Sequence, residues 1–248
     1  MKTHIKQIVF LLLITLSFSC SNDDDNQTIK LTDKEILQAI LDANPNNTLG
    51  WDLETTTDLG TLVGVHTDSE GQIIQLLLSG YNLVTIPSEI GQLINLKMLS
   101  LSENQLTSLL PEIGQLTNLG DLNLFNCQLT SLPKEIGQLS NLKNLNLFRN
   151  KLTSLPKEIG QIIRLEFLSV PENQLTFLPK EIGQLVNLNG LGFSKNQLTT
   201  VPSEFGQLTN LEVLNLSDNP ISSIPQEVCD LQTNGNLEII TDPGEGCN

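Results

Sequence analysis

A repeat of 23 residues is the feature that most constrains how this chain can fold. The same pattern begins seven times without an insertion. Its first residues are Ile73, Leu96, Leu119, Leu142, Leu165, Leu188 and Leu211. Repeats this regular pack only on their neighbours, so the hydrophobic core grows copy by copy. The chain is therefore expected to form a solenoid.

The first half of each copy alternates apolar and polar residues. In the second copy, Leu99 and Leu101 alternate with Met98, Ser100 and Ser102. This period of two predicts a short strand with one face inward. Seven such strands stacked in one direction predict a concave parallel sheet.

The second half of each copy predicts a short helical turn on the convex side. In the third copy, Pro133 is expected at the first helical position, where its missing N–H costs nothing. Glu135 lies in the first turn, where a carboxylate faces the positive end of the helix dipole. Gly137 is expected to end the turn through its permissive backbone. Because the glutamate recurs in every copy, this column is interpreted as structural rather than catalytic.

These two halves, LxxLxLxxNxL followed by LTSLPxEIGQL, resemble the leucine-rich repeat family in its short bacterial form, LPxEIGxLxNL. The resemblance covers residues 73–233 and implies an α/β solenoid with helical or 3-10 turns on the convex side. The family takes Asn or Cys at the ninth place, where an amide pairs backbone groups of the turn. Cys127 is therefore expected to be a buried free thiol. The asparagines of this column are Asn104, Asn150, Asn173, Asn196 and Asn219.

Residues 1–19 resemble the signal peptide of a lipoprotein. A positively charged start precedes an apolar core at residues 8–16, which is too short to span a bilayer. The sequence SFSC then resembles a lipobox, which implies that Cys20 becomes the lipid-modified first residue. The alternative is a plain secretory signal cleaved near Ser19.

Residues 20–31 predict an acidic, flexible tether, because SNDDDNQ has no apolar residue to bury. An acidic run after a lipidated cysteine also resembles the surface-export signal of some Gram-negative lipoproteins, although a solvated spacer needs no such signal. Together these segments predict an exported protein that is anchored in the outer membrane through its lipid alone, and they leave open whether it faces the periplasm or the outside of the cell.

Caps are expected at both ends of the solenoid. Residues 32–72 predict an N-terminal cap, with an amphipathic helix opened by the Thr32 and Glu35 capping box. This cap resembles in outline that of plant-type extracellular repeats, without their cap cysteines, so Trp51 and the helix are expected to close the first edge of the sheet. Residues 234–248 predict a C-terminal cap with a last strand at 237–241.

The four cysteines fit an exported chain. In such a chain, Cys229 and Cys247 are expected to form a disulfide that holds the C-terminal cap. With Cys20 lipidated and Cys127 buried, no cysteine is left over for a metal site.

Composition argues against several classes of function. A net charge of −15 without a basic cluster argues against nucleic acid as a partner. Once the signal is removed, His66 is the single histidine, so no His-based catalytic triad or His/Cys metal set can form. No GxxxxGK loop follows a strand. The chain is expected not to be an enzyme and to need no cofactor or metal.

The variable places of the concave sheet are the candidates for partner binding. Phe125 and Phe148 are expected to stack as neighbours, with Phe167 diagonal to them, as the aromatic centre of an interface. The other candidates surround these rings. They are Met98, Asp121, Asn123, Asn144, Asn146, Arg149, Glu172 and Lys195.

Two alternatives apply to these residues. Arg149, Glu172, Lys195 and Asp218 alternate in charge along one column, and this pattern also fits plain cross-strand pairs. The phenylalanines could stack only on the sheet and on each other.

The favoured function is a non-catalytic, exported binding module that recognises a protein or peptide partner through its concave face. One alternative is a structural surface lipoprotein that self-associates as a homodimer. The other is a glycan-binding adhesin, favoured by the asparagine amides beside aromatic rings.

Overall fold

The computed structural model describes residues 30–234, 237–242 and 247. Residues from Leu31 onward form one compact unit. The signal segment, Cys20 and most of the tether lie outside the described residues, so their roles stay predictions. Among the described residues, no helix is long and apolar enough to cross a membrane.

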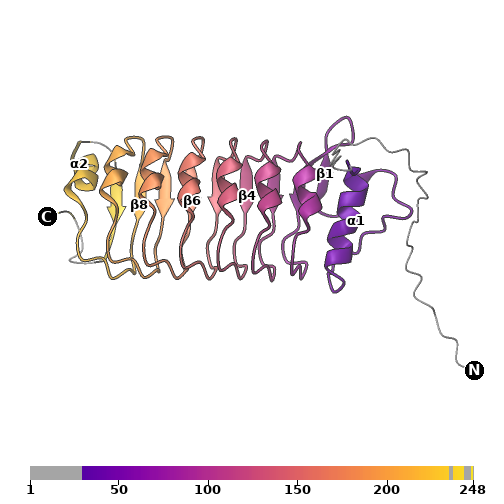
Figure 1. Ribbon diagram of the computed structural model, residues 1–248, viewed down its shortest axis with the longest axis horizontal. Helices are drawn as coiled ribbons and strands as arrows, with labels where there is room; N and C mark the ends of the chain where they lie inside the picture. The colour runs from indigo at the N-terminus through magenta and orange to yellow at the C-terminus, as the bar shows by residue number, and fades with distance from the viewer. Residues whose placement is uncertain (1–29, 235–236, 243–246, 248) are drawn as a thin grey trace, which may run out of the picture. The chain divides into compact units, whose positions relative to one another are not determined.

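A single sheet runs through this unit in chain order, as Figure 1 shows. Its strands are β1 (Val65–Thr67), β2 (Ile73–Leu77), β3 (Met98–Ser100), β4 (Asp121–Asn123), β5 (Asn144–Asn146), β6 (Phe167–Ser169), β7 (Gly190–Gly192), β8 (Val213–Asn215) and β9 (Glu238–Ile240). The strands β2 to β9 are all parallel, as the repeat predicted.

The register of the sheet keeps equivalent residues of each copy side by side. Leu122 pairs with Leu99 on one side and Leu145 on the other, and all three side chains are buried. The leucines of each copy therefore stack into one continuous core. The residues before and after each of them face outward, which leaves the concave surface free to vary between copies.

The convex side carries one five-residue 3-10 helix in each of the first six copies. These helices are η2 (Ser88–Gln92), η3 (Pro111–Gln115), η4 (Lys134–Gln138), η5 (Lys157–Gln161), η6 (Lys180–Gln184) and η7 (Ser203–Gln207). The prediction that proline fills the first helical position is correct only for Pro111. In the other five copies, proline is the capping residue before the helix, as Pro133 is for η4, with extended backbone.

The recurring glycine in these turns has a different cause from the one expected. Gly137 lies inside η4 rather than at its end, and its φ is not positive. A Cβ added at Gly137 would lie 2.4 Å from the backbone oxygen of Glu158 in the next copy. Glycine is needed here because adjacent turns pack too closely for a side chain.

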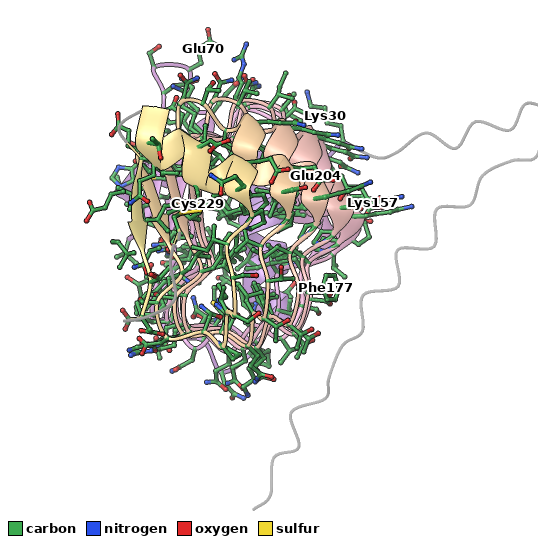
Figure 2. All side chains as sticks on the ribbon, turned by 90° about the vertical axis from the view of Figure 1, so that its left-hand side faces the viewer. Lys30, Glu70, Lys157, Phe177, Glu204 and Cys229 are labelled. Carbon is green, nitrogen blue, oxygen red and sulfur yellow. A yellow bond between two sulfur atoms is a disulfide. The ribbon has the colours of Figure 1, made fainter. Side chains whose placement is uncertain are left out.

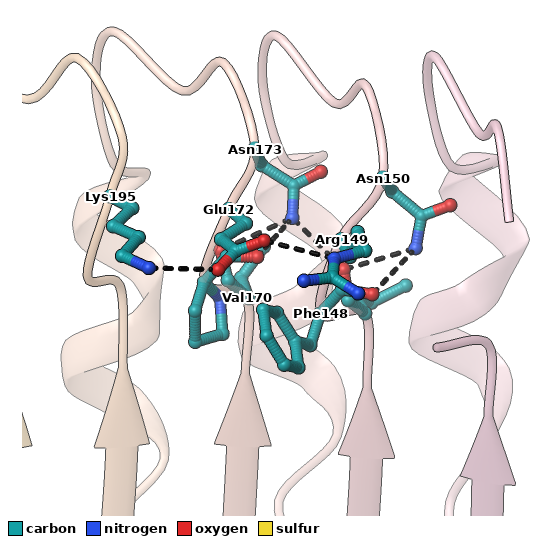
Figure 3. Close-up of polar contacts among 9 residues, drawn as sticks. Phe148, Arg149, Asn150, Val170, Glu172, Asn173 and Lys195 are labelled. Atoms are coloured by element: carbon teal, nitrogen blue, oxygen red, sulfur yellow. Dashed lines mark hydrogen bonds and ion pairs between the residues drawn. The ribbon is translucent and has the colours of Figure 1, made fainter. Parts of the chain in front are cut away.

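The asparagine column pairs backbone groups of the turn as predicted, and it also joins neighbouring copies. The Nδ2 group of Asn150 donates to the Leu124 oxygen at 2.8 Å and to the Leu147 oxygen at 3.0 Å. Its Oδ1 atom accepts from the Leu129 N–H at 3.0 Å. Figure 3 shows Asn150 and the equivalent Asn173 in this role. Each buried amide therefore pairs three backbone groups that water cannot reach.

Cys127 is the buried free thiol that the repeat predicted, and burial raises its pKa. Its Sγ atom lies 3.3 Å from the Leu101 oxygen. In the next copy, the Leu129 N–H donates to the side-chain oxygen of Asn150. The equivalent group here is the Leu106 N–H, which faces Cys127 instead of an asparagine. A thiol is only a weak acceptor, so Cys127 offers this N–H little.

We expect Cys127→Asn to raise the free energy of unfolding by about 1 kcal/mol, because it would supply the missing acceptor. The urea midpoint of the variant measures this gain. A lower midpoint than that of the parent protein would show that the thiol is packed too tightly for an amide.

The N-terminal cap contains one predicted element, the helix, and two that were not predicted. The helix α1 (Asp33–Ala43) has the expected capping box and buries Ile36, Leu37 and Ile40. A short 3-10 helix, η1 (Leu59–Thr61), follows. Trp51 is buried, and its Nε1 group donates to the Val63 oxygen at 2.9 Å.

The strand β1 was not predicted, and it pairs antiparallel with β2. The edge of β2 is therefore covered by a strand, while the helix α1 packs on η2. Covering an edge in this way removes a template for aggregation.

The seventh copy carries α2 (Gln226–Asn234), which takes the place of a 3-10 turn and packs on η7, just before the predicted C-terminal cap. The predicted disulfide joins Cys229 to Cys247, with their Cα atoms 5.4 Å apart. The strand β9 forms where a last strand was expected.

Candidate binding site on the concave face

The predicted site residues come from strands β3 to β6 and from the turns that follow strands β4 to β7. Met98, Asp121, Asn144 and Phe167 form one row across the sheet, because the strand register places them side by side. Of these four, Phe167 is the most exposed, at 48%.

Two of the predicted polar residues form hydrogen bonds with the backbone through their side chains. The Oδ1 atoms of Asn123 and Asn146 accept hydrogen bonds at 3.1 Å from the N–H groups of Phe125 and Phe148. A short amide bonded two residues ahead stabilises a turn. These asparagines therefore fix the turns that present the two rings.

Phe125 and Phe148 form the neighbouring pair that was predicted. Their ring centroids lie 5.2 Å apart with a tilt of 40°, and both side chains are half-buried. The expectation that Phe167 lies diagonal to them is wrong. Phe167 occupies the third place of its copy and the pair occupies the seventh, so its ring leans over Gly190 of the next strand instead.

Arg149 connects the ring pair to the charged column. Its guanidinium carbon lies 5.5 Å from the centroid of the Phe148 ring and 5.9 Å from that of Phe125. Its Nε atom also lies 3.0 Å from Glu172 Oε2. An arginine over aromatic faces gains a cation–π attraction while its other N–H groups can bind a ligand.

Glu172 lies between two cations, as Figure 3 shows. Its Oε1 atom is 3.0 Å from Lys195 Nζ, and its Oε2 atom contacts Arg149. The alternative of cross-strand pairs is therefore correct for these three residues. Among the described residues, Asp218 forms no ion pair and instead donates its N–H to Asp242 Oδ2.

The hydrogen bonds from Lys195 and then Arg149 lower the pKa of Glu172 below its usual value of 4.5. A carboxyl with a lowered pKa keeps its charge above that pKa, so this column should persist from neutral pH down to below 4.5. We expect Arg149→Ala to move the pKa of Glu172 back upward. A pH titration of the Glu172 carboxyl by NMR measures its pKa in the parent protein and in the variant. A pKa at or above 4.5 in the parent protein would contradict the two ion pairs of Glu172.

The backbone of the eighth place was not foreseen from the sequence. In every copy this residue has a positive φ. The residues are Gly80, Glu103, Asn126, Arg149, Glu172, Lys195 and Asp218. Side chains other than glycine adopt this conformation only where the surrounding structure imposes it. The sequence does indicate this backbone conformation, since the eighth place holds only glycine, asparagine or charged residues.

Two neighbours of the ring pair were also missed. Pro171 occupies the seventh place next to Phe148, and Asn126 follows Phe125. Both could be found from the sequence, because Pro171 has the same place in its copy as Phe148, and Asn126 has the same place as Arg149. The name ring-pair site is used below for the paired rings of Phe125 and Phe148 together with Arg149, Pro171, Glu172 and Lys195.

Nothing in the described part of the chain resembles a metal centre, since no group of three or more His, Cys, Asp or Glu side chains could hold an ion. The ring-pair site offers apolar contact, cation–π attraction and charged hydrogen bonds, which are means of binding rather than of bond cleavage.

The repeats match three family models. The model for "Leucine-rich repeat region" matches residues 110–191, and two for "Leucine Rich Repeat" match residues 163–221 and 95–116. No curated protein matches the chain in sequence.

Solved structures share the fold. The LRR protein LIC12759 of Leptospira interrogans is 46% identical over 66% of this chain and 41% of its own, with a TM-score of 0.62. The Arabidopsis receptor kinase HAESA, in complex with the peptide hormone IDA and the co-receptor SERK1, is 25% identical over 86% of this chain and 41% of its own, with a TM-score of 0.71. A plant ice-binding protein is 26% identical over 86% of this chain and 70% of its own, also with a TM-score of 0.71.

This chain spans less than half the length of LIC12759 and of the HAESA chain. The relatives also differ in what they bind, so the fold alone does not decide function. The 23-residue repeat, the parallel sheet with its asparagine column and the matches to family models agree on one identity. The chain belongs to the leucine-rich repeat family.

Proposed function

We propose that this protein is an exported, lipid-anchored module that binds a protein or peptide through the ring-pair site. The observation that carries the proposal is the placement of Arg149 over the paired rings of Phe125 and Phe148. Aromatic residues and arginine at the centre of a surface, with polar residues around them, carry most of the energy of many protein interfaces.

The peptide-hormone complex of the related receptor kinase supports a peptide or protein as the partner. The geometry adds a second argument. Glu172 occupies one edge of the Arg149 guanidinium, and the rings cover part of it, so little side-chain freedom remains to be lost on binding. A preorganised site loses less entropy when a partner binds.

Export is supported by the signal-like segment and by the disulfide of the C-terminal cap, because such bonds persist in oxidising compartments. Mass spectrometry of the mature N-terminus tests the anchor. A lipid-modified Cys20 is expected, whereas an unmodified residue at the mature N-terminus would refute the anchor without touching the binding site.

Replacing Phe125 and Phe148 together by serine is expected to weaken partner capture at least about tenfold, because truncating central aromatic residues typically costs 2 kcal/mol or more. The measurement is a pull-down from native extracts, followed by titration of the captured partner. Phe177→Ser is the matched control, since this ring is 55% exposed and lies on the side away from the strands in Figure 2.

Unchanged affinity in the double variant, with its unfolding midpoint preserved, would reject the ring-pair site. Sedimentation over a range of concentrations separates this function from self-association. The proposal expects a monomer, and a dimer lost in the double variant would favour the structural alternative.

A further inference from the structure

A second surface feature lies at the other end of the strands, where the chain enters β5, β6 and β7. It is an open hollow of about 400 Å³. Its lining comes from the second place of the copies that begin at Leu142, Leu165 and Leu188, and from the residue just before the copies that begin at Leu165, Leu188 and Leu211. The lining residues are Lys143, Arg164, Glu166, Asn187, Asn189 and Asn210.

Two of the asparagines belong to a second column that fixes their orientation. The Nδ2 group of Asn187 donates to the Ile163 oxygen at 2.7 Å, and that of Asn210 donates to the Val186 oxygen at 2.8 Å. Within the described residues, no protein group donates to the Oδ1 atom of either side chain. The hollow is therefore lined by amide oxygens of fixed direction that are free to accept.

Arg164 lies where five of the other six copies have asparagine. One of its guanidinium nitrogens donates to Asn141 Oδ1 at 2.6 Å, and its remaining N–H groups are available to a ligand. Arg164 thus adds fixed donors to a row of acceptors.

The charges and the acceptors decide the class of ligand. Lys143 is neutralised by Glu166, whose Oε1 atom lies 2.7 Å from Lys143 Nζ. Exposed ion pairs contribute little, so recognition depends on directional hydrogen bonds. A phosphate or carboxylate offers acceptors only and cannot satisfy amide and carboxylate oxygens. A ligand with several hydroxyl groups can donate to these oxygens and accept from Arg164.

An apolar surface adjoins the polar lining. Phe167 is the first residue of β6, directly after Glu166, and is 48% exposed. Its ring lies over Gly190, the first residue of β7, directly after Asn189. An exposed ring beside such groups suits the C–H face of a sugar.

From this geometry we infer that the hollow at the start of β5, β6 and β7 is a binding site for a neutral saccharide. The amide oxygens of Asn187 and Asn210 accept from sugar hydroxyls, Arg164 donates to them, and Phe167 covers the apolar face. This hollow is independent of the ring-pair site, which lies at the opposite ends of these strands.

The test is an array of neutral and anionic saccharides probed with the purified full chain, followed by titration of the best-bound neutral saccharide. Arg164→Asn and Asn187→Ala are expected to weaken its binding at least about tenfold, the loss expected when hydrogen bonds to a charged or fixed partner are removed. The substitution of Arg164 is chosen because asparagine is the residue of this column in other copies, so the fold should be retained.

Phe167→Ser is expected to weaken saccharide binding while leaving partner capture by the ring-pair site unchanged. Arg149→Ala should do the opposite. Three outcomes would overturn the inference: no neutral saccharide bound, preference for sulfated or phosphorylated saccharides, or unchanged affinity in the Arg164 and Asn187 variants.

Discussion

Replacing Asn150 by alanine is expected to lower the free energy of unfolding by about 3 kcal/mol, because each buried backbone group left without a partner costs about 1–3 kcal/mol. The side chain pairs the Leu124 and Leu147 oxygens and the Leu129 N–H, and the position is 7% exposed. Water cannot easily take over these bonds without opening the stack.

Urea unfolding followed by circular dichroism measures this loss. Asn118→Ala is the matched control, because its exposed amide makes one bond, to the Ile94 oxygen at 2.8 Å. The control should lose less than about 1 kcal/mol, as expected for an exposed hydrogen bond. Equal losses in the two variants would show that the buried column is not what joins the copies.

Gly137→Ala is the second substitution with a large expected effect, at about 2–3 kcal/mol of destabilisation, the usual cost of forcing atoms into a close-packed interior. The added methyl group would lie 2.4 Å from a backbone oxygen of Glu158, which cannot turn aside as a side chain could. The convex turns of two copies must therefore separate.

Gly192→Ala makes the same chemical change where there is room. Its added Cβ would lie 3.8 Å from the Pro171 side chain and meet no closer atom. Because alanine restricts the unfolded chain more than glycine does, this control should be neutral or more stable by up to about 1 kcal/mol. Thermal unfolding measures the stability of both variants. A Gly137 variant as stable as the Gly192 variant would contradict the close packing of Gly137 against the backbone of Glu158.

Most of the fold could be predicted because each copy repeats the same local signals. Alternation at Leu99 and Leu101 predicted the strands, and Thr32 with Glu35 predicted the first helix. The antiparallel strand β1 could not be predicted, because three residues outside the repeat carry no periodic pattern. Its existence depends on pairing with β2, which is a tertiary effect.

The role of Gly137 was missed for a related reason. A glycine near the end of a turn usually supplies a positive φ. Here the constraint comes from the next copy, and sequence alone does not measure the distance between copies.

The ring-pair site could be predicted in part. The stacking of Phe125 on Phe148 follows from their shared place in adjacent copies. The separation of Phe167 from this pair also follows from its place, since it is the third residue of its copy and the paired rings are the seventh of theirs. The contact of Arg149 with both rings depends on its positive φ, which the sequence indicated only through the kinds of residue at the eighth place.

The most direct test of binding through the concave face is photo-crosslinking in cells that express the full chain, with p-benzoylphenylalanine placed at Phe148 or, separately, at Phe177. Both positions carry phenylalanine, but only Phe148 belongs to the ring-pair site. We expect a discrete crosslinked partner from Phe148, weakened by Arg149→Ala, and none from Phe177. Crosslinks that form equally at both positions, or only at Phe177, would contradict binding through the concave face.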